Sequence, residues 1–316
     1  MTNANKLPTP VKKKGAWYGT TRGDKVFLSI VYIVIALVVV ICAYPLYLTI
    51  IASISDPYAV YRGKVNLLPS GFTLESYKLV FTNKAIWRGY GNSVLYTVAG
   101  TLFNLFLTLP SAYALSKQRL YGRSFLTTVF IITMYFGGGM IPTYLLYKNL
   151  GLIDTRWVLI INGGLSVYNM IVTRTYFQNN ISETLFEAAR IDGANEFMVF
   201  FKLVLPLSAP IIAVITLYYA VGHWGSYFSA MIYTYDQTLQ PLQLVLRNIL
   251  ILNETAYTDA LASGDASLIA DASRQAYLAL TMKYSLVFIA SAPMLIAYPF
   301  VQKHFVKGIM VGSLKG

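Results

Sequence analysis

The segment "EAARIDGANEFMVF" (Glu187 to Phe200) carries side chains unlike those around it. The chain of 316 residues is 56% hydrophobic and 12% charged, yet four of these fourteen residues are ionised and one is Asn. Charged groups at helical spacing, with apolar residues between them, suit a surface that meets another protein in water. The chemistry predicted here is recognition of a soluble partner.

This chain has few of the residues that covalent catalysis or metal binding requires. The two histidines, His223 and His304, are far apart, and Cys42 is the single cysteine. A nucleophile with its base, or a set of metal ligands, needs more of these residue types at closer spacing. Gly63-Lys64 is followed by Val65, so a phosphate loop for ATP is also missing. We therefore predict neither an enzyme nor a metal site.

The same segment predicts a helix, a turn and a second helix. Thr184 and Glu187 have the spacing of a capping box, which starts the first helix. Gly193 supplies the turn that ends this helix, and the second helix begins near Asn195. One face of the second helix then carries four apolar side chains at i, i+3, i+4 and i+7, which are Phe197, Phe200, Phe201 and Val204.

Long apolar stretches predict the elements that must hold this segment. A membrane-spanning helix needs about 20 mainly apolar residues. Six stretches lack Asp, Glu, Lys and Arg and reach or approach that length, so we predict an all-α membrane protein with six transmembrane helices. These stretches are 26–55, 89–116, 124–147, 157–173, 203–235 and 284–302.

The distribution of basic residues predicts that both termini are cytoplasmic. A net charge of +12 would suggest nucleic acid in a soluble protein, but Lys and Arg also gather on the cytoplasmic side of membrane proteins. With the termini inside, the inner segments hold 15 Lys and Arg, against 10 in the outer ones. We therefore predict no nucleic-acid partner. The segments predicted to lie in the cytoplasm are 1–25, 117–123, 174–202 and 303–316.

The domain organisation follows from these spans. Residues 26–302 are predicted to form one transmembrane domain between the tails 1–25 and 303–316, and the outer segments 56–92 and 234–282 are its long loops. The spans hold no ionisable group except His223, which disfavours a carrier driven by protons or sodium. A six-span secondary carrier nevertheless stays open as an alternative, as does a membrane enzyme.

The stretch "EAARIDGANEFMVFFKLVLPLSAP" (Glu187 to Pro210) closely resembles the EAA motif of ABC-transporter permeases. Leu203 replaces the usual Ile, and Met198 stands where Gln is common. The stretches 92–117 and 53–81 and the ending "GIMVGSLKG" resemble permeases of the carbohydrate-uptake type. Within these the chain is similar to MalG-like subunits, in the branch that imports oligosaccharides or polysaccharides such as alginate or pectin fragments.

This resemblance implies a type I ABC importer permease fold in the cytoplasmic (inner) membrane. A second permease subunit would complete a heterodimer, two ATPase subunits would bind ATP and Mg²⁺, and an extracytoplasmic solute-binding protein would deliver substrate. The loop 183–210 would be the cytoplasmic coupling helix that docks on the ATPase. Its contact and turn residues would be Glu187, Ala188, Ala189, Arg190, Asp192, Gly193, Ala194, Phe197 and Phe200.

The resemblance also implies a saccharide substrate, which favours aromatic faces and neutral hydrogen-bonding groups. The spans offer seven candidates for the substrate path, each of which could instead be a packing residue or an interface anchor. An ABC permease for a non-sugar solute is the remaining alternative. The candidates are Tyr135, Tyr144, Tyr168, Asn169, Tyr218, Trp224 and Tyr227.

Overall fold

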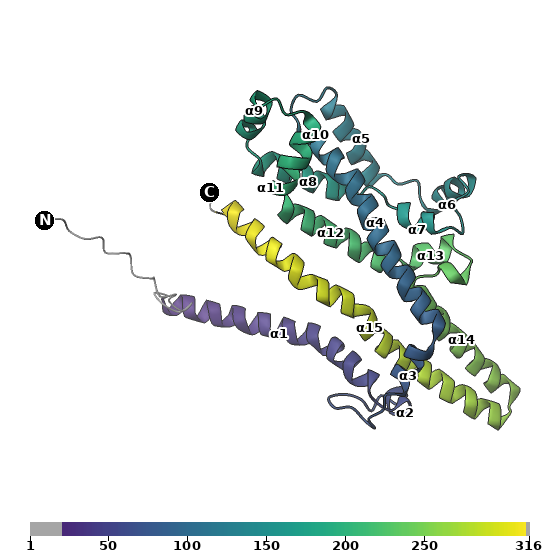
Figure 1. The fold of residues 1–316 in the computed structure, drawn as a ribbon. Helices are drawn as coiled ribbons and strands as arrows, with labels where there is room; N and C mark the ends of the chain where they lie inside the picture. The colour runs from purple at the N-terminus through teal and green to yellow at the C-terminus, as the bar shows by residue number, and fades with distance from the viewer. Residues whose placement is uncertain (1–20, 314–316) are drawn as a thin grey trace.

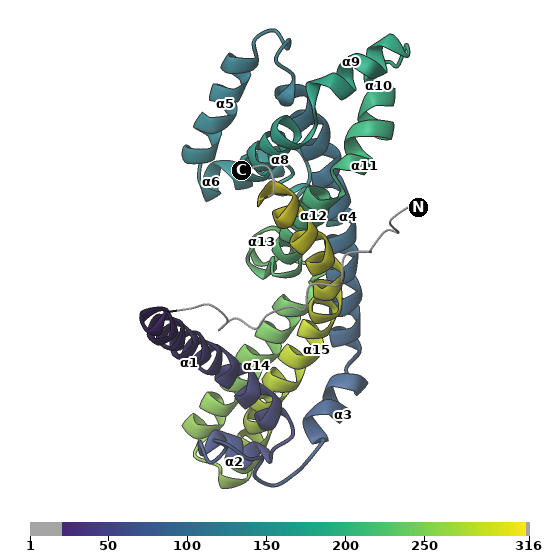
Figure 2. The same cartoon turned by 90° about the vertical axis from the view of Figure 1, so that its left-hand side faces the viewer.

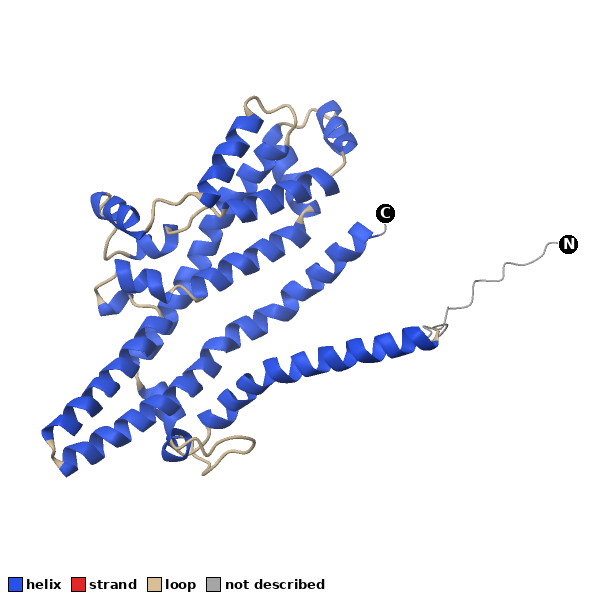
Figure 3. Ribbon diagram, turned by 180° about the vertical axis from the view of Figure 1, so that it is seen from behind, coloured by secondary structure: helices blue, strands red, loops and turns tan. Residues whose placement is uncertain are grey.

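The structure is a computed structural model that describes the backbone of residues 21–313 and the side chains of residues 21–296 and 299. Every regular element in that range is a helix (Figure 1, Figure 3), and an isolated bridge between Ser55 and Phe72 is its one strand-like pairing. The predicted all-α class is confirmed. Most of the predicted N-terminal tail, and the side chains of the predicted C-terminal tail, lie outside the described residues.

The first helix, α1 (Arg22–Ser53), stands apart from the rest of the molecule (Figure 1, Figure 2). It begins at a capping box, in which Thr21 and Asp24 bond each other's backbone N–H at 3.2 and 2.9 Å. Its apolar side chains are exposed all round, and burial starts only at Ile51, where the helix meets α15. A helix that is hydrophobic on every face suits a membrane span.

The centre of the molecule is α4 (Lys84–Ser116), capped by the Asn83 side chain, which accepts from the N–H of Ala85 at 2.9 Å. Both α8 (Val167–Asn180) and α12 (Ala209–Trp224) pack on α4. The largest cluster of buried apolar side chains forms where these three helices meet. They are the frame that positions both parts of the site described below.

Two predicted spans are bent. Helices α5 (Arg123–Tyr135) and α6 (Met140–Asn149) meet at 111° beside Gly139, whose φ of +85° favours glycine. Residues Glu196–Leu207 meet α12 at 82°. The described residues contain three helices long and apolar enough to cross a membrane, or five if each bent pair is one span.

The stretch 157–173 does not form one helix. It is divided between α7 (Arg156–Ile161) and α8, with a turn at residues 162–166. The interruption lies at Asn162-Gly163-Gly164, a run of residues typical of turns, and Gly163 has a φ of +68°. The expected count of six spans is therefore not confirmed.

The outer segment 234–282 is mostly helical. After α13 (Tyr227–Tyr233) and a 3₁₀ turn, η2 (Gln237–Leu239), α14 (Leu242–Ser263) turns at Gly264 into α15 (Ala266–Ser313). The apolar face of α14 packs on α15, so this outer segment forms a helical hairpin. No break separates residue 282 from the predicted last span. The other outer segment holds α2 (Pro57–Tyr61) and α3 (Glu75–Thr82).

Candidate functional site

A helical knuckle (residues 183–199) projects at one end of the molecule, opposite the turn between α14 and α15 (Figure 1, Figure 2). It consists of α9 (Glu183–Ile191) and α10 (Glu196–Val199). The Ser182 hydroxyl caps α9 by accepting from the N–H of Thr184 at 3.3 Å. The prediction that Thr184 is the cap is therefore wrong, because Ser182 offers the same hydroxyl two residues earlier.

The turn of the knuckle forms as the sequence predicts. Gly193 has a φ of +75°, and its N–H bonds the carbonyl of Arg190 at 3.0 Å. The N–H of Ala194 bonds the carbonyl of Ala189 at 2.9 Å, which completes a Schellman motif. The Asn195 side chain then caps α10 through the N–H of Met198 at 2.8 Å. The predicted turn and second helix are confirmed.

The predicted apolar face of the second helix is split. Phe200 and Val204 are buried in the main cluster, whereas Phe197 and Phe201 are exposed. Each pair is spaced i, i+4, and successive residues of a helix lie about 100° apart, so the two pairs cover neighbouring faces. A π-helical turn, η1 (Phe200–Val204), carries the chain from α10 into α11 (Leu205–Leu207).

A charged cluster fixes the root of the knuckle to the end of α4. The Tyr113 hydroxyl donates to Glu196 at 2.5 Å, and Lys117 Nζ and Arg190 Nη2 lie 4.0 and 3.9 Å from the same carboxylate. Lys117 Nζ also lies 3.2 Å from the centroid of the Phe186 ring, and burial lowers the pKa of this lysine. Tyr113, Lys117 and Glu196 were not predicted as site residues, since nothing in the sequence shows that they meet.

The tip of the knuckle is left open. Ile191 is 86% exposed and Phe197 is 77% exposed, beside the exposed carboxylate of Glu187. Of the predicted coupling residues, Phe200 is buried and the alanines at 189 and 194 are half-buried. The remainder are exposed, which are Glu187, Ala188, Arg190, Asp192, Gly193 and Phe197.

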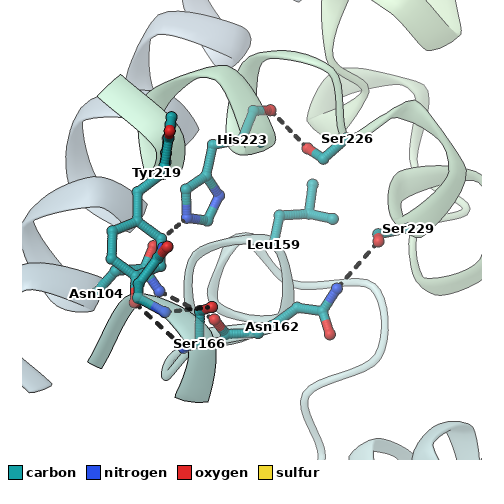
Figure 4. A pocket seen from close by; sticks show the side chains of 12 residues that line it. Asn104, Leu159, Asn162, Ser166, Tyr219, His223, Ser226 and Ser229 are labelled. Carbon is teal, nitrogen blue, oxygen red and sulfur yellow. Dashed lines mark hydrogen bonds between the residues drawn. The ribbon is translucent and has the colours of Figure 1, made fainter. Parts of the chain in front are cut away.

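A polar cavity of about 360 Å³ lies beside α4, α12 and the turn between α7 and α8 (Figure 4). Its lining, taken from the described residues, contains no Asp, Glu, Lys or Arg. Amides, hydroxyls and one imidazole provide its polar groups, which suits a neutral or hydroxyl-rich ligand. The polar side chains are Asn104, Asn162, Ser166, Asn169, Tyr218, Tyr219, His223, Ser226 and Ser229.

Asn104 organises this cavity. Its fully buried amide donates to the carbonyls of Gly163 and Gly164 at 3.1 and 2.8 Å, and its Oδ1 lies 2.6 Å from Nε2 of His223. The hydroxyl of Tyr219 accepts from the N–H of Ser166 at 3.2 Å. These bonds satisfy backbone groups that the break between α7 and α8 leaves free, as a membrane interior requires.

Two of the seven predicted substrate-path residues line this cavity, Asn169 and Tyr218. Trp224 is buried and donates to the carbonyl of Ala290 at 3.1 Å, a packing role. Tyr144 bonds the hydroxyl of Tyr235 at 2.7 Å outside the cavity. The other three are exposed and do not line it, and these are Tyr135, Tyr168 and Tyr227.

Comparison with known proteins gives matches over most of the chain. The sequence profile of the family described as "binding-protein-dependent transport system inner membrane component" matches residues 85–311. The polygalacturonan/rhamnogalacturonan transport system permease protein YtcP of Bacillus subtilis is 38% identical over 293 residues, which cover 93% of this chain and 99% of that protein. Protein LplC of the same organism is 42% identical over 250 residues, covering 79% and 81%.

A solved structure also matches. It is a chain from the crystal structure of a bacterial ABC transporter involved in the import of the acidic polysaccharide alginate. The TM-score is 0.78 and the identity is 32%, and the match covers 90% of this chain and 99% of that chain. The fold of an ABC importer permease is thereby confirmed.

Proposed function

This chain belongs to the family of binding-protein-dependent transport system inner membrane components, and on that premise we propose that it imports acidic oligosaccharides. It is a multi-pass permease component of an ABC importer and not itself an enzyme. Family membership also removes the secondary carrier as an alternative. We assign a substrate to the chain, partner subunits on which it docks, and the residues that make these contacts.

The knuckle is the observation that carries the proposed coupling role. Its root is fixed by the buried rings of Phe186 and Phe200 and by the Glu196 cluster. Its tip presents Ile191 and Phe197 to water, and none of the residues that the structure describes covers them. A short rigid element that is bound firmly at one end, with an apolar tip at the other, suits a lever inserted into a groove of an ATPase subunit.

Two observations support the proposed substrate, one for its acidic character and one for its sugar hydroxyls. The relatives described above carry names or titles that refer to polygalacturonan, rhamnogalacturonan and alginate transport. The cavity around Asn104 offers amide and hydroxyl groups without a fixed charge, which suits sugar hydroxyls. Asn169 and Tyr218, together with Asn162 and His223, are the residues we propose along the substrate path.

The remaining parts of the proposal concern the assembly. A second permease subunit forms the other half of the pathway, two ATPase subunits bind ATP and Mg²⁺ beneath the knuckle, and a solute-binding protein docks on the opposite side. The termini and the knuckle then face the cytoplasm. Family membership and the exposed apolar surface of α1 support this arrangement.

Reconstitution of the complete importer tests the coupling role. Each exposed apolar side chain buried on docking contributes roughly 1.5–3 kcal/mol, so the double variant I191A/F197A should bind the ATPase subunits at least about tenfold more weakly. Phe72→Ala is the matched control, since this exposed ring lies near α2 and α3, away from the knuckle. Equal ATPase retention in all three proteins would contradict the proposal.

The substrate is tested with the same preparation. Oligogalacturonates should stimulate ATP hydrolysis and uptake in the presence of the binding protein, whereas uncharged maltodextrins should stimulate them less. Stimulation by maltodextrins alone would overturn the acidic class. Stimulation by a non-sugar solute and by no saccharide would overturn the sugar assignment, while leaving the coupling role to be judged from ATPase retention.

A further inference from the structure

A second cavity, separate from the polar cavity around Asn104, lies between α5 and α8. It has a volume of about 340 Å³ and is lined by Arg123, Ser124, Thr127, Thr128 and Arg174. Two guanidinium groups therefore border one small space, together with three hydroxyl-bearing residues. Neither the coupling role nor the substrate path uses any of these side chains.

Neither arginine forms an ion pair with an Asp or Glu side chain. All 13 Asp and Glu residues fall between residues 24 and 271, within the part that the structure describes. Their ion pairs involve Lys117, Arg190 and Arg274, and none reaches Arg123 or Arg174. Two like charges that share a cavity without a counter-charge repel each other, and an anion between them would remove that cost.

Arg174 also has an unsatisfied donor. Its Nε is buried and has no hydrogen-bond partner among the described residues. A buried donor left without a partner costs about 1–3 kcal/mol. Arg174 borders the cavity, so a ligand there with several acceptor oxygens would accept hydrogen bonds from donors, such as this Nε–H, that have no partner in the described protein.

The other hydrogen-bond donors around the cavity also favour an anion. The first turn of α5 follows Gly122, which offers no side-chain cap. The N–H of Arg123 bonds the carbonyl of Leu120 at 3.2 Å, and the N–H groups of Ser124 and Phe125 have no partner among the described residues. The hydroxyls of Thr127 and Thr128 donate to the carbonyls of Arg123 and Ser124 at 2.8 and 3.0 Å. This leaves the guanidinium groups, the Ser124 hydroxyl and the helix N-terminus as the donors, and all of them suit a phosphate group.

The position of the pair indicates where the phosphate comes from. Arg123 immediately precedes the charge-free stretch 124–147, and Arg174 immediately follows the stretch 157–173. Charged residues at the ends of apolar segments lie at the level of the lipid head groups. The end of α5 that begins at Arg123 lies on the side of the knuckle (Figure 2), and Arg174 borders the same cavity.

We propose that Arg123 and Arg174 form a site for a phosphate group, supplied by the head group of an anionic phospholipid. The bound lipid would hold α5 against α8, beside the knuckle. Charged contacts to one phosphate explain the shared cavity, the missing counter-charge and the unpaired Nε together. Free inorganic phosphate is the alternative source with the same chemistry.

The test uses the purified importer in nanodiscs of phosphatidylcholine, with or without phosphatidylglycerol, in phosphate-free buffer. Native mass spectrometry counts the phosphatidylglycerol that each protein retains. The double variant R123Q/R174Q should retain it about tenfold or more weakly than the wild type, since two charge-assisted contacts are lost. Arg119→Gln is the matched control, because Arg119 is an exposed arginine of the same segment that does not line the cavity.

Thermal unfolding separates binding from misfolding. In phosphatidylcholine alone the double variant should be at least as stable as the wild type, because it lacks the repulsion between like charges. Phosphatidylglycerol should then raise the unfolding temperature of the wild type and of R119Q, but not that of the double variant. This pattern cannot come from a variant that merely folds badly.

Three results would overturn the proposal. One is equal retention of phosphatidylglycerol by the wild type and the double variant. A second is stabilisation of the wild type by inorganic phosphate in phosphatidylcholine with none from phosphatidylglycerol, which would assign the site to the free ion. The third is loss of the ATPase subunits from the double variant with lipid retention unchanged, which would make the pair a protein contact.

Discussion

Lys117 lies over the ring of Phe186, with its Nζ 3.2 Å from the ring centroid and 4.6 Å from the centroid of Tyr113. Lys117 follows the last residue of α4, and Phe186 belongs to α9. A cation held between two aromatic rings stabilises their arrangement by roughly 1–2 kcal/mol when it is partly desolvated. The contact therefore ties the knuckle to the central helix, and α4 and the knuckle should move together.

The stability of the protein should depend on pH through Lys117. Burial lowers the pKa of Lys117 below its ordinary value of 10.5. Between the lowered pKa and 10.5 the unfolded chain binds more protons than the folded chain, so the free energy of unfolding rises with pH in that interval. Lys117→Arg does not titrate there and should lack this increase. Thermal unfolding of both proteins measured across the interval would show parallel profiles if the prediction is wrong.

Removing the Tyr113 hydroxyl should loosen the knuckle. The hydroxyl donates to Glu196 at 2.5 Å, and the ring packs on Phe200 with centroids 5.1 Å apart. Tyr113→Phe keeps the ring and removes a hydrogen bond to a charged group, so it should cost about 1.5–3 kcal/mol. Hydrogen exchange of residues 183–199 should then be faster. Tyr121→Phe is the control, since that tyrosine is 99% exposed, and equal exchange in the two variants would count against the role of Glu196.

Glycine should be required at position 193 because of the backbone conformation of this turn. A Cβ at this position would meet nothing within 4 Å, but the φ of +75° is strained for other residues. Gly193→Ala should cost about 1–2 kcal/mol and lower the uptake obtained per ATP hydrolysed. Gly264→Ala is matched, because that glycine has a φ of +70° and open space at the other end of the molecule. The Gly264→Ala variant should lose similar stability and keep the same uptake per ATP hydrolysed. An equal loss of this coupling in both variants would refute the role of the knuckle as the lever.

Asn104 should be required for the break between α7 and α8. Asn104→Ala removes the donor for the carbonyls of Gly163 and Gly164, which should cost about 2–4 kcal/mol and reduce uptake. Asn92→Ala is the control, because Asn92 also donates to two carbonyls, at 2.7 and 3.1 Å, but does not line the cavity. The stability of the Asn92→Ala variant should fall while its substrate selectivity stays unchanged. Identical selectivity in both variants would argue against a substrate path through this cavity.

Gly100 should tolerate no side chain, because a Cβ there would lie 2.3–2.7 Å from three ring atoms of His223. Gly100→Ala should displace the imidazole from Asn104 and destabilise the protein by about 1–3 kcal/mol. Gly91 lies in the same helix with nothing within 4 Å, so Gly91→Ala should raise stability slightly. Thermal unfolding of the two variants gives the comparison, and a stabilising Gly100→Ala would mean that His223 does not pack against α4.

Much of the knuckle could be predicted because its signals are local. Gly193 and Asn195 act on backbone groups within a few residues, so their types and spacing already specify a turn and a cap. That Phe197 is exposed whereas Phe200 is buried could not be predicted in this way. A face with period 3.6 covers more than 100° of a helix, and only the neighbours in space decide which part of it is covered.

The substrate path was harder to predict for a related reason. Composition identified neutral polar residues in the spans, but the cavity draws them from α4, from α12 and from a turn between two short helices. Tyr144 has the same residue type as the lining Tyr218 but bonds Tyr235 outside the cavity, and Trp224 bonds the carbonyl of Ala290. Without the packing of α4 against α12, no pattern separates these groups.

The sequence by itself determined the class of molecule, since long charge-free stretches and a soluble-looking segment with an EAA pattern are properties of the chain that need no partner in space. Only the tertiary structure decided the angles at which those stretches bend, that Lys117 and Glu196 meet beneath the knuckle, and that Arg123 and Arg174 share a cavity. The physical reason is the range of the interactions. Solvation and helix capping act on neighbours in sequence, whereas a cavity or an ion pair depends on residues that are distant in the chain and adjacent in the fold.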